Sequence, residues 1–139
     1  MLESRLANQR EIGALGEAVA YRYEYLRLHS LNCANPDAHI TDHTKENIGV
    51  GYDLESYFNG EKRYIEVKSS VVNNESFFLS ENERETLDKL GMEAYVYLVK
   101  VNKADSKESK VVREIRNPIN HPGLSLDPVA YSASFTNED

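Results

Sequence analysis

Hydrophobic residues in the first part of the chain recur at the spacing of one helix face. Residues 6–28 form a single long amphipathic run, which predicts a helix whose apolar stripe covers a sheet. The residues of this stripe are Ile12, Leu15, Val19, Tyr23 and Leu26. Gly16 lies inside the run, where glycine costs about 1 kcal/mol relative to alanine. We therefore expect Gly16 to pack closely against the sheet.

An Asn-Gly pair at residues 59–60 separates two strand-like runs, residues 50–58 and 61–68. Asn-Gly is the strongest short-range hairpin signal, because both residues tolerate the positive φ angles of a type I′ turn. With a two-residue loop, each strand position has a fixed partner on the other strand. This register places Asp53 directly opposite Glu66.

The second half of the chain begins with another strand-like run, at residues 76–79. Ser80 and Glu83 then form the Ser-x-x-Glu pattern of a capping box, which predicts the start of a helix. This helix should run to about Leu90, and Gly91 has the position of a residue that ends a helix.

Residues 94–101 are apolar on both faces, as expected for a central strand that is covered on both sides. Residues 111–116 predict a returning strand and residues 129–135 a last one, and residues 39–43 form a short strand before the hairpin. The order of these elements predicts an α/β fold with the core order αβββαβ and extra C-terminal strands. It consists of one mixed sheet flanked by helices.

Composition limits the class of protein. The 139 residues fit a single domain spanning 1–139, and 40% hydrophobic residues with seven Gly and four Pro exclude disordered and collagen-like chains. No apolar run reaches the roughly 18 residues of a membrane span, and the N-terminus lacks the apolar core of a signal peptide. We therefore expect a soluble, cytoplasmic protein with no membrane partner. The lone Cys33 excludes internal disulfides and multi-cysteine zinc sites.

The net charge of −7 argues against binding nucleic acid by bulk electrostatics. Any intrinsic affinity for nucleic acid should therefore be weak.

Candidate chemistry lies on the predicted hairpin. Side chains alternate along a strand, so Glu66 and Lys68 share one face while Ile65 and Val67 point to the core. Asp53 faces Glu66 across the hairpin, at a Cβ separation of about 4.5–5.5 Å. Like charges that face each other destabilise a sheet. A divalent cation such as Mg²⁺ would neutralise their repulsion, because it binds one or two carboxylates together with waters and phosphate oxygens.

Lys68 would stand beside such an ion, where it can hold an attacking water or neutralise charge that develops on a phosphate. The arrangement outlines a metal-assisted phosphodiesterase. The simpler interpretation is a solvated strand face on which Lys68 pairs with the two acids.

Other candidates are weaker. His39 and His43 flank the short strand, but on a strand their rings would lie about 13 Å apart, too far for one zinc ion. Tyr52, Tyr57 and Tyr64 either contact a substrate or pack on the sheet. Two further tyrosines of the predicted central strand belong to the core. These are Tyr95 and Tyr97.

Several segments, spread over most of residues 10–135, resemble the family named for the C-terminal domain of protein NO VEIN. They are GEAVAYRYEYL, NIGVGYDLES, YIEVKSS, FFLSENE, AYVYLVKV, RNPI and LDPVAY. By resemblance this family belongs to the PD-(D/E)XK nuclease superfamily, whose restriction-endonuclease-like core is αβββαβ. Tyr52 stands where the superfamily name has a proline, a position that varies within the superfamily.

The resemblance implies roles for individual residues. Asp53 and Glu66 would be metal ligands, with the carbonyl of Val67 as a third, and Lys68 would be the catalytic lysine. Glu17 corresponds to an acidic residue on the first helix that often completes the site. The implied metal is Mg²⁺, with Mn²⁺ as a substitute.

Glu17 lies away from the apolar stripe of its helix, which suits a side chain that reaches the site and equally one in water. Glu83 is explained by the capping box and is left out of the predicted site.

Three functions remain open. The first is a Mg²⁺-dependent nuclease that acts on DNA in a restriction or defence system. The second is a non-catalytic interaction or nucleic-acid-sensing module of a larger protein assembly, and the third is a phosphohydrolase of small nucleotides. The expected partners are DNA, bound weakly, and a larger assembly or a second copy of the chain.

Overall fold

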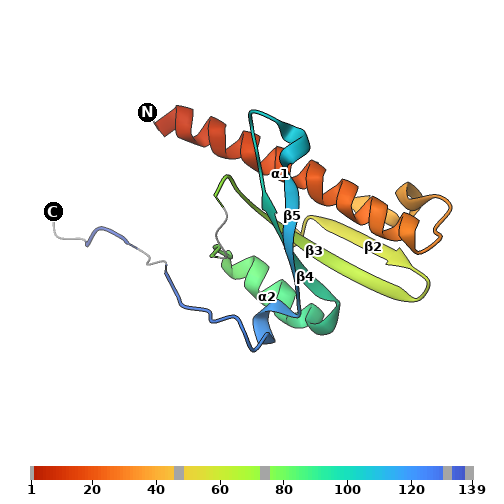
Figure 1. Ribbon diagram of the computed structural model, residues 1–139. Helices are drawn as coiled ribbons and strands as arrows, with labels where there is room; N and C mark the ends of the chain where they lie inside the picture. The colour runs from red at the N-terminus through yellow and green to blue at the C-terminus, as the bar shows by residue number, and fades with distance from the viewer. Residues whose placement is uncertain (1, 46–48, 73–75, 130–132, 137–139) are drawn as a thin grey trace.

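The computed structural model describes residues 2–45, 49–72, 76–129 and 133–136, and all structural statements refer to these residues. Two helices and five strands make up the fold (Figure 1). They are α1 (Leu2–Ser30), β1 (Ile40–Asp42), β2 (Leu54–Phe58), β3 (Glu61–Ser70), α2 (Glu81–Leu90), β4 (Ala94–Lys100) and β5 (Lys110–Arg116). Short 3-10 turns lie between or after them: η1 (Pro36–His39), η2 (Gly91–Glu93), η3 (Ser106–Glu108) and η4 (Pro118–Asn120).

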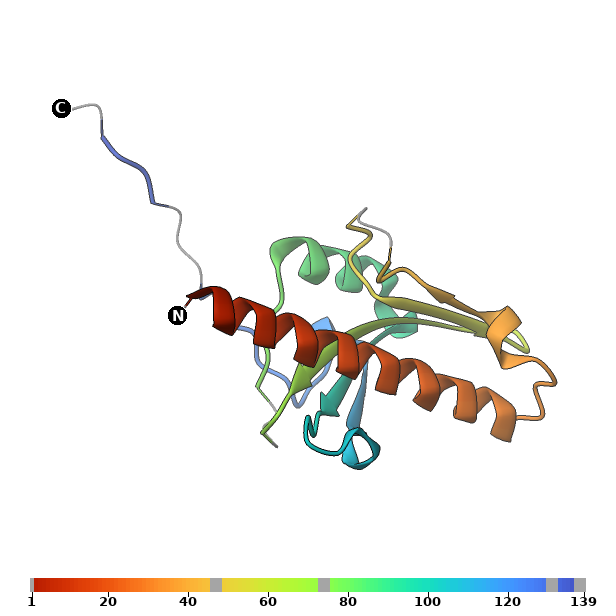
Figure 2. The same ribbon diagram turned by 90° about the horizontal axis from the view of Figure 1, so that it is seen from above.

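The five strands form one mixed sheet in the order β1-β2-β3-β4-β5. The β3–β4 pair is parallel and the other pairs are antiparallel, so the chain must cross over between β3 and β4. Helix α2 lies within this crossover, and α1 covers the opposite face of the sheet (Figure 2). The predicted mixed sheet with flanking helices is confirmed.

The hairpin of β2 and β3 has the predicted register. Phe58 pairs with Glu61 and Leu54 with Ile65. The turn residues at positions 59 and 60 have φ angles of 54° and 81°, the left-handed values that a type I′ turn requires.

Helix α1 packs through most of its predicted stripe onto a core that includes Ile65, Val67 and Tyr97. The contacting stripe residues are Ile12, Leu15, Val19 and Tyr23. The prediction for Leu26 was wrong, because this side chain is 49% exposed. The last turns of α1 pack instead against η1 and β1 through Leu28, so the buried face turns away from Leu26.

A buried polar network also joins α1 to the sheet. The Tyr97 hydroxyl donates to Glu24 at 2.6 Å, and Arg63 donates to the Tyr97 oxygen at 2.8 Å and to Glu114 at 2.6 Å. Burial opposes the charged form of Glu24, but hydrogen bonds from Arg27 and Tyr97 lower its pKa below the ordinary value. The fully buried carboxylate is therefore satisfied.

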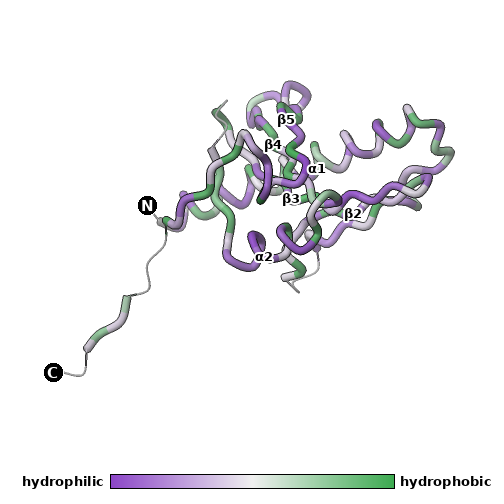
Figure 3. The backbone as a smooth tube through the Cα atoms, turned by 90° about the horizontal axis from the view of Figure 1, so that it is seen from below, coloured by the Kyte–Doolittle hydropathy of each residue, from purple (hydrophilic) through white to green (hydrophobic). Residues whose placement is uncertain are grey.

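The opposite face of the sheet packs against α2. Leu87 contacts a cluster formed by β4 and β5 residues, whereas the rest of α2 is mostly hydrophilic (Figure 3). Both hydrogen bonds of the capping box are present, between Ser80 and Glu83, and Gly91 ends the helix with a φ of 57°. The boundaries predicted for this helix are confirmed.

Two predicted strands are not formed by described residues. Residues 76–79 are an extended connection: Phe77 and Leu79 pack on the α2-side cluster while Phe78 is 75% exposed. This packing produces a strand-like alternation without a hydrogen-bonded neighbour strand. Of residues 129–135, the described ones form no strand, and residues 130–132 lie outside the described part of the chain.

No helix in the described ranges combines the length and apolar composition needed to span a membrane.

Gly16 marks the closest approach of α1 to the sheet. A Cβ atom at this position would lie 2.6 Å from the Cβ of Ser69, at the end of β3. A Cβ atom at Gly13, one turn earlier, would have no neighbouring atom within 4 Å. The two glycines therefore differ in packing while sharing the same helix.

We expect Gly16→Ala to be less stable than Gly13→Ala by about 1–3 kcal/mol, the usual cost of overpacking. Both variants gain the same helix propensity, about 1 kcal/mol, so their difference isolates the contact with Ser69. Urea unfolding followed by circular dichroism measures it. Equal stabilities would contradict the close approach of α1 to β3.

Candidate active site

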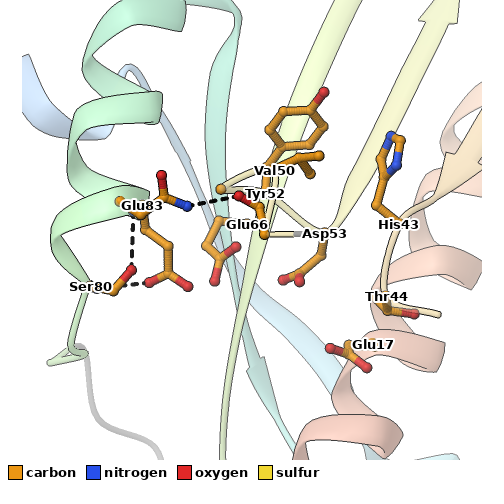
Figure 4. A pocket seen from close by; sticks show the side chains of 12 residues that line it. Glu17, His43, Thr44, Val50, Tyr52, Asp53, Glu66, Ser80 and Glu83 are labelled. Atoms are coloured by element: carbon orange, nitrogen blue, oxygen red, sulfur yellow. Dashed lines mark hydrogen bonds between the residues drawn. The ribbon is translucent and has the colours of Figure 1, made fainter. Parts of the chain in front are cut away.

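A polar pocket of about 310 Å³ opens between the hairpin, α1 and the start of α2. Carboxylates from three directions line it (Figure 4). They are Glu17 from α1, Asp53 from the end of the loop before β2, Glu66 from β3 and Glu83 from α2. In Figure 4 the side chains of Asp53, Glu66 and Glu83 point toward one another.

Asp53 lies directly before β2, where the regular pairing of the hairpin ends at Leu54 and Ile65. Its backbone N–H donates to the carbonyl of Ile65 at 2.8 Å, and its carbonyl accepts from the N–H of His43 at 2.8 Å. Its side-chain Oδ2 accepts a hydrogen bond from the N–H of Val67, also at 2.8 Å. These hydrogen bonds fix Asp53 beside Glu66, although the paired register itself ends at Leu54 and Ile65.

Glu66 is only 4% exposed, and Lys68 lies next to it on the same face of β3. The Nζ atom of Lys68 is 3.2 Å from Oε2 of Glu66 and 2.9 Å from Oε1 of Glu83. The ammonium group is therefore held between two carboxylates, and one of them, that of Glu83, comes from helix α2.

Glu83, left out of the site predicted from the sequence, lines the same pocket. The same Oε1 that accepts from the N–H of Ser80 in the capping box, at 3.0 Å, also accepts from Lys68. The order of the elements could have indicated this contact. Helix α2 connects the parallel strands β3 and β4, so its first turn lies near the strand that carries Glu66 and Lys68.

Glu17 lies in the pocket with Asp53 and Glu66, whereas Lys68, paired with Glu66 and Glu83, is not among the residues that line it. Burial raises the pKa of Glu17 to about 7, helped by the negative charges of Asp53 and Asp42.

The other titratable groups of the site also depart from their ordinary values. Burial, followed by the charge of Asp53, raises the pKa of Glu66 to about 9. Burial likewise raises the pKa of Asp53, although the N–H of Val67 opposes this. Burial disfavours the charged forms of Lys68 and Glu83, but their mutual contact and neighbouring groups raise the lysine pKa and lower the glutamate pKa.

The site has the donor set of a hard divalent cation. Among the described residues, no three His, Cys, Asp or Glu side chains are grouped to enclose a metal ion. Mg²⁺ does not need such a cage, because one or two carboxylates suffice when water and phosphate oxygens supply the other ligands. The neighbouring carboxylates of half-buried Asp53 and buried Glu66 fit this requirement. The role of the Val67 carbonyl stays a prediction.

The two histidines considered for zinc have other partners. His39 Nδ1 lies 2.9 Å from the carbonyl oxygen of Tyr57, and His43 Nε2 lies 3.4 Å from Glu55. His43 also lines the pocket, which no sequence pattern indicated.

A mixed α/β domain with a carboxylate-lined pocket at a hairpin is the class of protein that the fold and the site define. The sequence profile described as Protein NO VEIN, C-terminal matches residues 16–114, and the chain belongs to this family. The match spans every residue of the pocket discussed above. No curated protein and no solved structure matches the chain significantly.

The facing carboxylates predict an unusual effect on stability. We expect Asp53→Asn to raise the melting temperature in EDTA, with a gain of about 0.5–1 kcal/mol, because it removes one of two like charges across the hairpin. Asparagine keeps an oxygen that can accept from Val67. The measurement is thermal unfolding above pH 9, where Glu66, whose pKa burial raises to about 9, carries its negative charge.

Asp127→Asn is the matched control, since it removes one charge from an exposed residue far along the chain from the site. If both variants melt like the wild type, repulsion between Asp53 and Glu66 does not limit stability.

Proposed function

We propose that the protein is a Mg²⁺-dependent nuclease that hydrolyses phosphodiester bonds in DNA. The observation that carries this proposal is that Asp53 and Glu66 line one open pocket and that Lys68 forms an ion pair with Glu66 at 3.2 Å. The resemblance to PD-(D/E)XK nucleases supports it, because an aspartate before one hairpin strand and Glu-x-Lys on the next form the pattern of that superfamily. A restriction or defence setting follows from the same resemblance.

Asp53 and Glu66 would hold the ion, with the Val67 carbonyl as a further ligand. When bound, Mg²⁺ would polarise a phosphate oxygen and make a bound water more acidic. Hydrolysis forms a bond from the water oxygen to phosphorus and breaks the bond from phosphorus to one ester oxygen, which leaves with a proton.

Lys68 has two tasks in this scheme. Its ammonium group can orient the attacking water and neutralise the charge that develops on the phosphate. Glu83 is a positioning residue, because its hydrogen bond fixes the ammonium group near Glu66. Glu17 adds a carboxyl group with a pKa of about 7 at the edge of the pocket, where it can exchange a proton near neutral pH.

A non-catalytic interaction module is the second candidate, and the net charge of −7 favours it. Such a module has no physical reason to bury two facing carboxylates beside a lysine, since this arrangement costs stability. A phosphohydrolase of small nucleotides would need no basic track for DNA. Either alternative is compatible with a larger assembly or a second copy of the chain as partner.

Cleavage assays distinguish these functions. The substrates are plasmid, single-stranded DNA, RNA and nucleotides, each with Mg²⁺, Mn²⁺ or EDTA. We expect metal-dependent cleavage of DNA, reduced at least about a hundredfold in Asp53→Asn, Glu66→Gln and Lys68→Met. Glu17→Gln should have an intermediate rate. Cleavage by Lys68→Met at the wild-type rate would refute the role of the lysine.

Glu83→Gln tests the positioning of Lys68. We expect a loss of about tenfold, typical of a group that orients a catalytic residue. Glu81→Gln is the matched control, because Glu81 lies in the same helical turn but is exposed and paired with Arg84. Equal rates for the two variants would remove Glu83 from the site.

Metal binding can be tested without activity. An ion that binds only the folded state stabilises it by RT ln(1 + [L]/Kd), about 2.7 kcal/mol at a hundredfold excess over Kd. We expect millimolar Mg²⁺ or Mn²⁺ to raise the melting temperature of the wild type and of Asp127→Asn, with most of the gain lost in Asp53→Asn. An equal response of all three proteins would contradict the metal site.

A further inference from the structure

One half of the sheet face that carries Glu66 is not covered by α2. Helix α2 packs against β4 and η4, and the hairpin of β2 and β3 extends beyond it (Figure 2). Tyr64 and Lys62 alternate with Glu66 along β3, so they share its face. Tyr57 pairs with Lys62 across the hairpin and is 50% exposed.

Aromatic rings follow one another along this uncovered face. The ring centroids of His43 and Tyr52 are 5.3 Å apart, and those of Tyr52 and Tyr64 are 5.1 Å apart. Lys62 continues the series, with Nζ at 5.5 Å from the ring centre of Tyr64 and 5.8 Å from that of Tyr57. We call these five residues, His43, Tyr52, Tyr64, Lys62 and Tyr57, the aromatic strip.

The aromatic strip is continuous with the candidate active site. His43 and Tyr52 line the same pocket as Asp53 and Glu66, and in Figure 4 their rings extend from it on the side away from the carboxyl groups. A polymer that lies along the strip would therefore enter the pocket at Tyr52.

The aromatic rings and the single lysine of the strip favour a single-stranded nucleic acid over a duplex. Aromatic rings stack on nucleic-acid bases of any sequence, but only on bases that are not already stacked in a duplex. Lys62 supplies a positive charge among the rings, whereas holding a duplex by its phosphates requires a basic track that this chain of net charge −7 does not suggest.

We propose that the aromatic strip binds the unpaired bases of a single-stranded nucleic acid and leads that strand into the pocket. The binding itself requires no cleavage, but its consequence, the choice of a single-stranded substrate, rests on the proposed function.

The test is fluorescence anisotropy with labelled oligo(dT) and oligo(rU) of 30 nucleotides and a duplex of equal length. It uses the full chain in EDTA, where a metal-dependent enzyme cannot cut. We expect either single strand to bind at least tenfold more tightly than the duplex. The salt dependence should be shallow, with a slope near −0.7, because Lys62 provides about one phosphate contact.

Tyr57→Leu should weaken binding of the single strand at least about fivefold, because it removes one stacking ring. Tyr57→Phe is the matched control, since it keeps the ring and should bind within twofold of the wild type. The exposed position of Tyr57 leaves folding unaffected by either change.

Three results would each overturn the proposal: equal affinity of Tyr57→Leu and wild type, equal or tighter binding of duplex, or a steep salt dependence that is the same in all variants. The outcome is separable from that of the cleavage assays. Metal-dependent cleavage with normal binding by Tyr57→Leu refutes the strip alone, whereas ring-dependent binding without any cleavage refutes the nuclease alone.

Discussion

The placement of Asp53 beside Glu66, at the end of the β2–β3 hairpin, is the constraint on which the candidate site depends. A two-residue turn sets the register, and backbone hydrogen bonds to Ile65 and Val67 hold Asp53 in place. A slip of one residue would send one carboxylate to the core face. The turn therefore determines the local chemistry, because it brings the carboxyl groups of half-buried Asp53 and buried Glu66 together and creates the demand for a cation or a proton.

The helices on the two faces of the sheet supply the remaining carboxylates of the pocket. On one face, the missing side chain of Gly16 lets α1 approach β3 closely, which brings Glu17 into the pocket. On the other face, the capping box that starts α2 also places Glu83 on Lys68. Each helix thus contributes one carboxylate: α1 next to its close contact with β3, and α2 from its capping box.

Local sequence signals made part of the fold and of the candidate site predictable. The turn at residues 59–60, the capping box and the apolar run of β4 each depend on a few neighbouring residues, and each was correct. Failures occurred where distant elements decide the outcome. Leu26 is exposed because the end of α1 packs on η1 and β1, and residues 76–79 lack a partner strand although their side chains alternate. Glu83 was missed because its second contact exists only once α2 lies over β3.

The negative charge of the chain is consistent with a nucleic-acid substrate once its distribution is considered. Some of the acidic residues lie in the pocket, where burial raises the pKa of Glu66 to about 9 and of Glu17 to about 7, so these groups carry less than their formal charge at neutral pH. A divalent ion at Asp53 and Glu66 would offset more of it. Stacking on exposed rings depends little on net charge. Under the proposed function, an acidic protein would therefore hold a strand through its bases, and its attraction for phosphate would be confined to the position of the ion and Lys68.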